Sequence, residues 1–366
     1  MNQYISKINS LERPVAKVSG MVSVSVFSGG GGLDLGLSLA GFDIGYASDE
    51  ERYYCDTLKL NFPGCFVDVK DVKDINMKSI CEVIGKSHIE LLSGGSPCQA
   101  FSILGKRKSF DDERGQLVFE FIRLIEELAP SVFIFENVPG ILTLNKGSDW
   151  EFLRSRFEST GYKIFQKVLN AADFGIPQIR KRLFVIGFRK ATNFIFPSPT
   201  HYNPSQDPNL LEYCLSKWLP AKLVFESTSS LLNNDIRPHG DRVRNRYKLV
   251  PQGSRDLIDH TNRIHAEKPA GTVLVGSKAG GGRPHIHPYL PRHITVREAA
   301  RLQSFPDWYV FQGTQTAQYR QVGNAVPPLL AYAVGKAIRQ ALDLNSLTDR
   351  PIAEKYKSGC LDLVIV

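Results

Sequence analysis

The sequence predicts an α/β fold: a mostly parallel sheet covered by helices on both faces, an antiparallel hairpin at one edge, and a smaller irregular second domain. Three observations support this prediction. From about residue 22, short β-type runs alternate with amphipathic helical runs, as in parallel sheets. The runs 163–170 and 182–188 leave no room for a helix between them, so they should pair as a hairpin. After residue 190 the alternation stops, and Pro, Asn, Ser and Gly become frequent.

The individual elements follow from local signals. Strands are predicted, in chain order, at 22–27, 44–48, 65–69, 89–93 and 132–138. One helix is predicted to follow the glycine cluster and to end at Gly41. Further helices are predicted at 50–61, 115–129, 149–159, 295–303 and 328–342. Pro63 and Pro130 mark the ends of two of them. A turn-like stretch containing FPDW separates the last two.

Composition restricts the class of protein. The chain has 366 residues, 42% of them hydrophobic and 22% charged, which supports a sizeable core and argues against disorder. The six cysteines include no CxxC pair, so we expect no disulfide framework or zinc knuckle, and a reducing cytoplasm. No apolar run is long enough to span a bilayer, and the N-terminus lacks the apolar core of a signal peptide. The formal net charge of +8 suits a polyanionic partner without requiring one.

The stretch FSGGGGLDLGLSLAGF (27–42) places glycines between a strand and a helix, where α/β folds bring the backbone close to a cofactor. Asp49, Glu50 and Asp68 follow where the second and third strands should end. Acids at about this distance commonly bind ribose hydroxyls. A plain tight turn and solvated helix-cap acids explain the same residues, so this pattern alone leaves both interpretations open.

The stretch GGSPCQAFSILGKRKSFDDERG (94–115) is more informative. Cys98 follows a strand and lies between Pro97 and Gln99. These surroundings disfavour the usual role of a cysteine as a small core residue. The residues after it include Lys106 and Arg107 and few apolar anchors, which predicts a lid suited to phosphate contacts.

Three further stretches carry polar groups that could join the same site. FENVPG (135–140) puts Glu136 at the end of a buried strand, where a carboxyl group is costly unless solvated, paired or catalytic. In FGIPQIRKRLFVIG (174–187), Gln178, Arg180 and Arg182 precede a strand, with both arginines on one face if the chain is extended. YRQVGNAVPP (319–328) places a Gly-Asn turn before a helix.

Residues 191–293 contain 13 Lys/Arg against 8 Asp/Glu, so they hold most of the excess positive charge. The densest cluster consists of Arg237, Arg242, Arg244, Arg246 and Lys248. A phosphate-contacting surface and a solvated loop face both fit it. The alternating histidines His285, His287 and His293 could suggest a metal site, but surface histidines explain them as well, and we predict no metal.

Taken together and in this order, the motifs resemble those of the cytosine-5 DNA methyltransferases, typically bacterial modification enzymes. FSGGGGLDLGL resembles the first motif of that family, and GGSPCQAFS with DDERG its nucleophile loop. The later motifs are matched by ENVPGIL, DFGIPQIRKRLFVIGFR, ITVREAARLQSFPDW and QYRQVGNAVPP. The similarity covers about residues 21–190 and 268–340. The stretch between them corresponds to the variable target-recognition segment of the family.

The resemblance implies a domain organisation. A Rossmann-like methyltransferase domain spans 21–190 and is completed by 294–345. A target-recognition domain spans 191–293. Residues 1–20 form an N-terminal extension, and 346–366 form a C-terminal tail.

The resemblance also implies a reaction. A methyl group moves from S-adenosylmethionine, leaving S-adenosylhomocysteine, to carbon 5 of a cytosine flipped out of duplex DNA. Cys98 is the implied nucleophile, adding to carbon 6 of the ring. Glu136 is implied to hold ring nitrogen 3 and the exocyclic amine, Arg182 the base carbonyl oxygen, and Arg180 the pocket around them.

The binding residues are implied in the same way. Those for the cofactor are Phe27, Gly29, Gly30, Gly32, Leu33, Asp49, Glu50, Asp68, Val69, Pro97, Leu117, Asn324 and Val326. Asp49 aligns best with the ribose-binding acid, with Glu50 second, and Gly30 stands where relatives often carry a larger apolar residue. Those for DNA are Gln99, Ser102, Lys106, Arg107, Arg114, Arg242, Arg244, Arg246 and Thr272. We expect a cytoplasmic monomer that acts on duplex DNA, with a restriction endonuclease for the same site as a candidate partner.

Three rival functions remain to be weighed. A nicotinamide-dependent oxidoreductase shares the glycine loop and the acid, but gives no reason for PCQ, ENV and the paired arginines. A tRNA cytosine-5 methyltransferase would share the catalytic core; the basic insert of roughly a hundred residues favours duplex DNA instead. A catalytically silent DNA-binding relative would not need Cys98, Glu136 and Arg182 intact.

Overall fold

The fold is built around one seven-stranded sheet with the order β3-β2-β1-β4-β5-β7-β6. The computed structural model describes residues 2–15, 20–96, 113–205, 215–226, 228, 230–273 and 284–348. The strands are β1 (Met21–Val26), β2 (Phe42–Asp49), β3 (Phe66–Val69), β4 (Leu91–Gly94), β5 (Val132–Asn137), β6 (Lys163–Asn170) and β7 (Lys181–Phe188). All pairings are parallel except those made by β7, which is antiparallel to both β5 and β6. The predicted parallel sheet and its antiparallel edge hairpin are confirmed.

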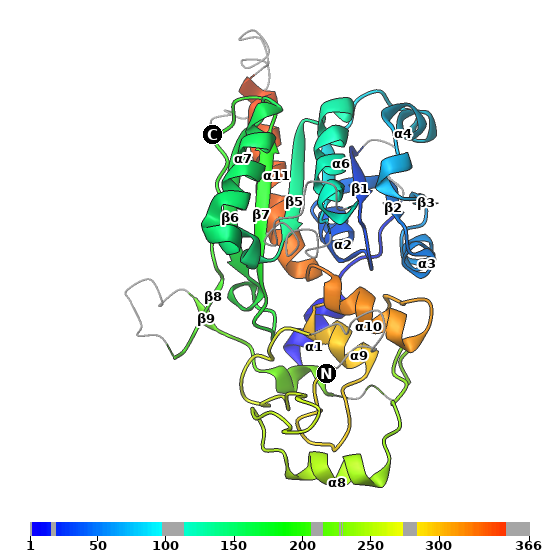
Figure 1. The fold of residues 1–366 in the computed structure, drawn as a ribbon, viewed down its shortest axis with the longest axis vertical. Helices are drawn as coiled ribbons and strands as arrows, with labels where there is room; N and C mark the ends of the chain where they lie inside the picture. The colour runs from blue at the N-terminus through cyan, green and yellow to red at the C-terminus, as the bar shows by residue number, and fades with distance from the viewer. Residues whose placement is uncertain are drawn as a thin grey trace, which may run out of the picture.

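Helices cover both faces of this sheet and extend beyond it. They are α1 (Gln3–Asn9), α2 (Gly32–Leu39), α3 (Arg52–Asn61), α4 (Met77–Ile84), α6 (Glu113–Leu128), α7 (Ser148–Ser159), α8 (Asp241–Leu249), α9 (Val296–Leu302), α10 (Gln315–Asn324) and α11 (Pro328–Thr348). One face packs against α2, α3 and α11, and the other against α4, α6 and α7. Figure 1 shows the sheet face-on, with β6 at one side of the view and β3 at the other.

The alternation of side chains along β5 explains why the sheet needs both layers. Val132 and Ile134 belong to the core beneath α2 and α11, whereas Phe133 and Phe135 belong to the core beneath α6 and α7. All four are fully buried. A strand with apolar residues at every position is stable only if both of its faces are covered.

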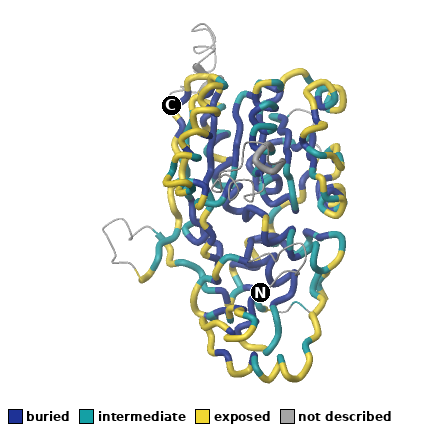
Figure 2. The backbone as a smooth tube through the Cα atoms, in the orientation of Figure 1, coloured by how far each residue is buried: buried dark blue, intermediate teal, exposed yellow. Residues whose placement is uncertain are grey.

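A second, less regular part lies beyond the carboxyl ends of the parallel strands (Figure 1). Besides α8 it contains two short strands, β8 (His201–Tyr202) and β9 (Ser216–Lys217), and the 3₁₀ turn η5 (Ala221–Val224). Figure 2 shows that most of this part is exposed except where it meets α1, α9 and α10. The predicted irregular character after residue 190 agrees with this structure.

Buried Arg301 joins the N-terminal segment, the irregular part and α9. Its guanidinium pairs with Asp307 (2.7 Å) and donates to the carbonyls of Val224 (3.1 Å) and Glu226. Its own carbonyl accepts the hydroxyl of Tyr4 in α1 (2.7 Å). The N-terminal extension is therefore docked on the fold, at least over residues 2–15.

Three elements differ from the predictions. Helix α4 was not predicted, and α11 continues to Thr348 instead of ending near residue 342. The stretch predicted as turn-like between α9 and α11 contains α10, so Gly323 and Asn324 end a helix. The missed helix buries Gln321 beside Tyr319 and Val322, which interrupts its apolar pattern. The described residues also contain the 3₁₀ turns η1 (Val72–Asp74), η2 (Pro139–Gly147) and η3 (Ala171–Phe174).

Within the described residues, no helix is both long and apolar enough to cross a membrane.

The Arg301 cluster predicts a large effect on stability. Arg301→Met should lower the free energy of unfolding by about 3–5 kcal/mol, because largely buried Asp307 loses its cationic partner and two backbone carbonyls lose a donor. The matched control is Arg154→Met, which removes an exposed pair with Glu158 (3.0 Å) and should cost less than about 0.5 kcal/mol. Urea denaturation of the two variants measures the difference. Equal losses would show that the buried Arg301 cluster stabilises the fold no more than an exposed ion pair does.

Candidate functional site

The loop between β1 and α2 has an unusual backbone conformation. Phe27, Gly29 and Gly31 all have positive φ angles, of 53°, 55° and 74°. Only glycine adopts this region without strain, so Phe27 is held there by its surroundings. The loop leaves Gly29 open, with no atom within 4 Å of an added Cβ. This combination provides exposed backbone at a helix N-terminus, which suits a bound cofactor.

The other glycines of the loop allow the C-terminal part of the chain to approach. An added Cβ at Gly32 would collide with the carbonyl oxygen of Val326, and one at Gly30 would lie 2.9 Å from the Cβ of Gln321. Tyr309 donates its hydroxyl to the Gly30 carbonyl (2.8 Å). The absence of a larger residue at position 30 is therefore explained by the packing of α10.

The acids at the ends of β2 and β3 have different surroundings. Asp49 accepts the amides of Gly29 (2.9 Å) and Glu51 (3.0 Å), so it fixes the glycine loop to the start of α3. Burial raises the pKa of Asp49 to about 6. Glu50 is exposed beside it. Asp68 accepts the hydroxyl of Tyr46 (3.3 Å).

Asp34 is a buried carboxyl group that the sequence analysis did not single out. It lies in the first turn of α2, is fully buried, and neither of its carboxyl oxygens has a hydrogen-bond partner. Burial, with a smaller contribution from the charge of Asp49, raises the pKa of Asp34 to about 7. The helix that follows the glycine loop thus contains a carboxyl group that retains its proton close to neutral pH.

At the end of β5, Glu136 forms a largely buried ion pair with Arg182 of β7. Arg182 Nε lies 2.9 Å from Glu136 Oε1, and the side chains are 11% and 13% exposed. An added Cβ at Gly95 would lie 2.8 Å from Glu136 Oε2, so the chain after β4 contacts the same carboxyl group. Burial raises the pKa of Glu136, and the charges of Arg182 and Arg180 oppose this shift.

Arg180 is the most buried residue of this cluster. It is fully buried, and burial lowers its pKa well below the usual value. One guanidinium nitrogen donates to the carbonyl of Asn324 (3.1 Å), while Nε and Nη1 have no protein partner. Unpartnered donors of this kind are costly in a closed core and favourable where a ligand oxygen can accept them.

Several predicted residues lie outside the described residues. They are Pro97, Cys98, Gln99, Ser102, Lys106 and Arg107, together with the side chain of Arg114. The chain is described up to Ser96, whose carbonyl accepts the side-chain amide of Asn137, the neighbour of Glu136 (3.2 Å). Cys98 is therefore two residues away from a backbone group fixed at the Glu136 edge. Leu117, in α6, is half-buried.

The cofactor and catalytic predictions meet at one short segment. The carbonyl of Asn324 binds Arg180, and the carbonyl of Val326 lies against Gly32. Two residues that are close in the sequence, at the end of α10, therefore contact the glycine loop on one side and Arg180 on the other. Leu33 is half-buried in α2, and Val69 is 40% exposed at the end of β3.

The basic residues of α8 do not share one role. Arg242 and Arg244 are exposed. Arg246 was predicted to contact DNA, but its guanidinium is held by Asp256 (2.8 Å) and Asp259 (2.6 Å). These ion pairs connect α8 to the loop that follows it, and the DNA contact of Arg246 stays a prediction. Figure 1 shows α8 at the end of the molecule far from the sheet.

Thr272 and the three histidines make structural contacts. Thr272 donates to the carbonyl of Ile179 (3.0 Å). His285 Nε2 lies 3.2 Å from the Gly271 carbonyl, His287 lies 3.7 Å from Glu298, and His293 lies 2.9 Å from the Tyr247 hydroxyl. No group of metal-binding side chains occurs within the described ranges.

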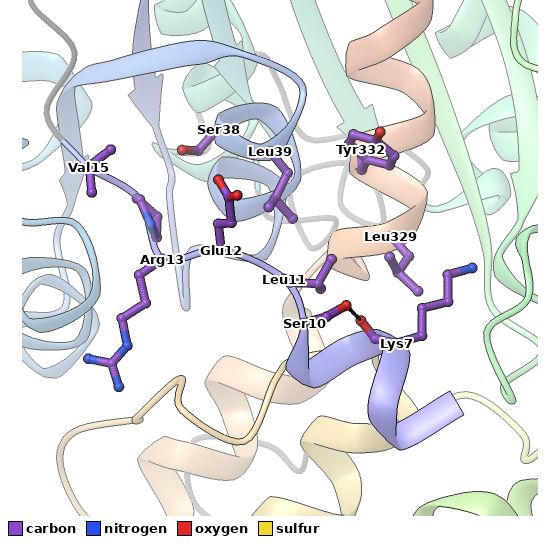
Figure 3. Close-up of a pocket in the computed structure, with 11 residues that line it drawn as sticks. Lys7, Ser10, Leu11, Glu12, Arg13, Val15, Ser38, Leu39, Leu329 and Tyr332 are labelled. Carbon is purple, nitrogen blue, oxygen red and sulfur yellow. Dashed lines mark hydrogen bonds between the residues drawn. The ribbon is translucent and has the colours of Figure 1, made fainter. Parts of the chain in front are cut away.

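A groove of about 290 Å³ lies at a different place (Figure 3). It is formed between the N-terminal segment 7–15, the end of α2 and the start of α11, and includes Arg13, Leu39 and Tyr332. Because Leu39 is at the opposite end of α2 from the glycine loop, this groove does not belong to the site around Glu136.

The fold and the site define an α/β protein with a glycine loop and a buried polar cluster at the carboxyl edge of its sheet. The profile of the C-5 cytosine-specific DNA methylase family matches residues 21–340. The Type II methyltransferase M.XorII of Xanthomonas oryzae is 36% identical over 368 residues, covering 88% of this chain and 85% of that protein. M1.HphI of Haemophilus parahaemolyticus is 36% identical over 331 residues, covering 86% of each.

Solved structures agree with this similarity. A candidate DNA modification methyltransferase encoded within an E. coli prophage is similar with a TM-score of 0.68 and 28% identity, over 88% of this chain and 99% of that one. S. pombe Dnmt2, at 18% identity and a TM-score of 0.62, shares the fold. The chain belongs to the C-5 cytosine-specific DNA methylase family and is a DNA cytosine-5 methyltransferase, which requires a methyl donor.

The buried Asp34 predicts a pH-dependent difference in stability. Its pKa is higher in the folded state than in the unfolded state, so its stabilising effect is complete below pH 4 and is lost as the pH rises to about 7. Asp34→Asn should therefore match the wild type at pH 4 and be more stable by about 2–4 kcal/mol at pH 8. Urea denaturation across this range measures the difference.

Exposed Asp74 provides the control, since Asp74→Asn should give the same small difference at every pH. A constant difference between Asp34→Asn and the wild type would mean that Asp34 ionises normally in the folded protein.

Proposed function

We propose that the protein methylates carbon 5 of a cytosine flipped out of duplex DNA, through a covalent adduct with Cys98. The observation that carries this proposal is the buried Glu136–Arg182 pair beside the fixed end of the Cys98 segment. Carbon 5 of cytosine is a poor nucleophile. Addition of the Cys98 thiolate to carbon 6 converts the ring into an enamine that is nucleophilic at carbon 5.

Glu136 and its arginines would stabilise this addition. The Glu136 carboxyl group binds ring nitrogen 3 and the exocyclic amine, and keeps a proton near nitrogen 3 as negative charge develops. Its raised pKa favours this proton, since burial makes the ionised form less stable. Arg182, with Arg180 behind it, donates to the base carbonyl oxygen. Once carbon 5 carries the methyl group, loss of its proton expels the Cys98 thiolate and restores aromaticity.

S-adenosylmethionine, when bound, supplies an electrophilic methyl group on its sulfonium. The open backbone at Gly29 and the strained Phe27 fit this cofactor, and Gly30, Gly32 and Leu33 shape the loop beneath it. Around this loop we assign to the pocket Asp49, Glu50, Asp68, Val69, Pro97, Leu117, Asn324 and Val326. Because Asp49 already accepts two backbone amides, exposed Glu50 is the better placed of the two acids to reach the ribose hydroxyls.

Residues 191–293 would recognise the target sequence. Thr272, close to the catalytic arginines, would contact DNA at the target site. Gln99, Ser102, Lys106, Arg107 and Arg114 would close over the flipped base and its phosphates. Arg242 and Arg244 would contact phosphates farther along the duplex. Relatives are named Type II methyltransferases, so we propose that this chain works as a monomer that modifies one DNA sequence, alongside an endonuclease for the same site.

Covalent trapping tests the reaction. Bisulfite sequencing of DNA from a methylation-free host expressing the gene identifies the site, and a duplex with 5-fluorocytosine at that site should form a stable adduct with the protein. Fluorine cannot leave as a cation, so the elimination step fails. Cys98→Ala should abolish the adduct, whereas Cys81→Ala, in α4, should retain it. Glu136→Gln should slow its formation by about 10²–10⁴-fold.

Two results would contradict the proposal. An adduct with Cys98→Ala would exclude this thiol as the nucleophile. Methylation of tRNA and not of duplex DNA would show that the substrate is RNA.

The exposed arginines of α8 predict a change in salt dependence. Replacing both Arg242 and Arg244 by Ala should reduce the slope of log K against log salt by up to about 1.8, because each lost phosphate contact contributes roughly 0.9. Fluorescence anisotropy with a duplex at several salt concentrations measures the slope. Arg154→Ala, in α7, should leave it unchanged. An unchanged slope in the double variant would place α8 outside the DNA interface.

A further inference from the structure

The segment that leads into β7 is joined directly to residues 191–293, which are called the target-recognition part below. Residues 176–180 run beside residues 270–273: the amide of Ile179 donates to the carbonyl of Ala270 (2.8 Å), and Thr272 donates to the carbonyl of Ile179 (3.0 Å). Arg180 follows in the same segment. A displacement of 270–273 must therefore displace the backbone that carries the catalytic arginines.

Gln178 forms the centre of this connection. Its side chain is fully buried. Its Oε1 accepts the amide of Val273 (3.1 Å), and its Nε2 donates to Gln303 Oε1 (2.9 Å) and to the carbonyl of Leu302 (3.1 Å). Both ends of the amide are thus used, one toward the target-recognition part and one toward α9.

Gln303 continues the connection to the cofactor loop. It is also fully buried, and its Nε2 donates to the carbonyls of Val322 (2.5 Å) and Ala325 (3.4 Å). An added Cβ at Gly32 would lie 2.9 Å from the Cβ of Ala325. A continuous series of contacts therefore leads from Val273 through two amides to the glycine loop.

The two amides have only one consistent orientation. Because the amide of Val273 is a donor, Gln178 must turn its oxygen toward it and its nitrogen toward Gln303. Gln303 must then turn its oxygen toward Gln178 and its nitrogen toward the end of α10. Buried amides are costly unless fully paired, so a shift at one end leaves a donor or an acceptor unsatisfied.

We propose that Gln178 and Gln303 are positioning residues that couple DNA binding at 270–273 to cofactor binding at the glycine loop, a role that rests on the function proposed above. The pair holds segment 176–180 and the end of α10 in the arrangement that both ligands require. By thermodynamic linkage, S-adenosylhomocysteine raises the affinity for DNA by the same factor as DNA raises the affinity for S-adenosylhomocysteine.

The experiment measures this factor in the full-length protein. DNA affinity, for a duplex containing the methylated site, is determined by anisotropy with and without saturating S-adenosylhomocysteine, and calorimetry gives the affinity for S-adenosylhomocysteine alone. We expect a wild-type factor of about 5–150. Gln178→Met and Gln303→Met should each reduce the factor by about tenfold, or to one where the wild-type factor is below ten. The double variant should show no further loss, since either change interrupts the same connection.

Gln252→Met is the matched control. This glutamine also uses both ends of its amide, with the carbonyl of Pro288 (3.1 Å) and the amide of Ala266 (2.9 Å), but it lies within the target-recognition part. It should retain the wild-type factor. Should a methionine variant not fold, Gln178→Asn and Gln303→Asn shorten the side chain by one methylene, and each should reduce the factor in the same direction.

The outcomes separate the two proposals. A wild-type protein that binds neither S-adenosylhomocysteine nor duplex DNA would overturn the proposed function. A protein that binds both independently, or variants at positions 178 and 303 with the wild-type factor, would overturn the coupling and leave the function intact. A reduced factor in Gln252→Met as large as in Gln178→Met would show that general destabilisation causes the loss.

Discussion

The packing of residues 321–326 between the glycine loop and Arg180 is the contact on which the rest of the site depends. Gly30 and Gly32 have no side chains, so Gln321 and Val326 can lie against the loop backbone. From the other side, Arg180 donates to the carbonyl of Asn324. The start of the sheet, its antiparallel edge and the C-terminal helices therefore meet at one place. In the proposed reaction a methyl donor and a target base must approach within bonding distance, and this packing places the glycine loop close to the Glu136 cluster.

Several charges in the described interior are paired with an opposite charge: Glu136 with Arg182, Arg301 with Asp307, and Asp256 with Arg246. Pairing compensates the loss of hydration that each ion would otherwise suffer. Asp34 has no such partner, and burial raises its pKa to about 7, so a proton neutralises it below that pH. A charge beneath the glycine loop is thereby avoided, at the cost of sensitivity to pH.

The irregular part of the structure, within residues 191–293, is held by polar contacts more than by a large core of its own. Its separate buried cluster contains only Tyr247, Val250 and Ile286 among the described residues. Ion pairs around Arg246 anchor α8, and Arg301 and Gln178 connect the part to the rest of the fold. A small core leaves the surface residues free to vary, which agrees with the target-recognition role proposed for this part.

The sequence by itself determined the sheet, its edge hairpin, most helices and the family. Those features depend on local patterns: apolar runs such as 132–138, glycines that end or bend elements, and motifs whose residues are adjacent. Glu136, Arg180 and Arg182 could be singled out in the same way, because charges beside a buried strand are unusual. Helix α10 was missed because buried Gln321 interrupts its apolar pattern.

Only the tertiary structure decided how the polar residues are used. Arg246 looks like its exposed neighbours in the sequence, yet two carboxylates from a later loop hold it. Gln178 and Gln303, far apart in the chain, become partners only when the segment before β7 meets the end of α9. Asp34 gains its high pKa from burial that no local pattern reveals. A polar side chain is defined by the atoms that surround it, and folding brings those atoms from distant parts of the chain.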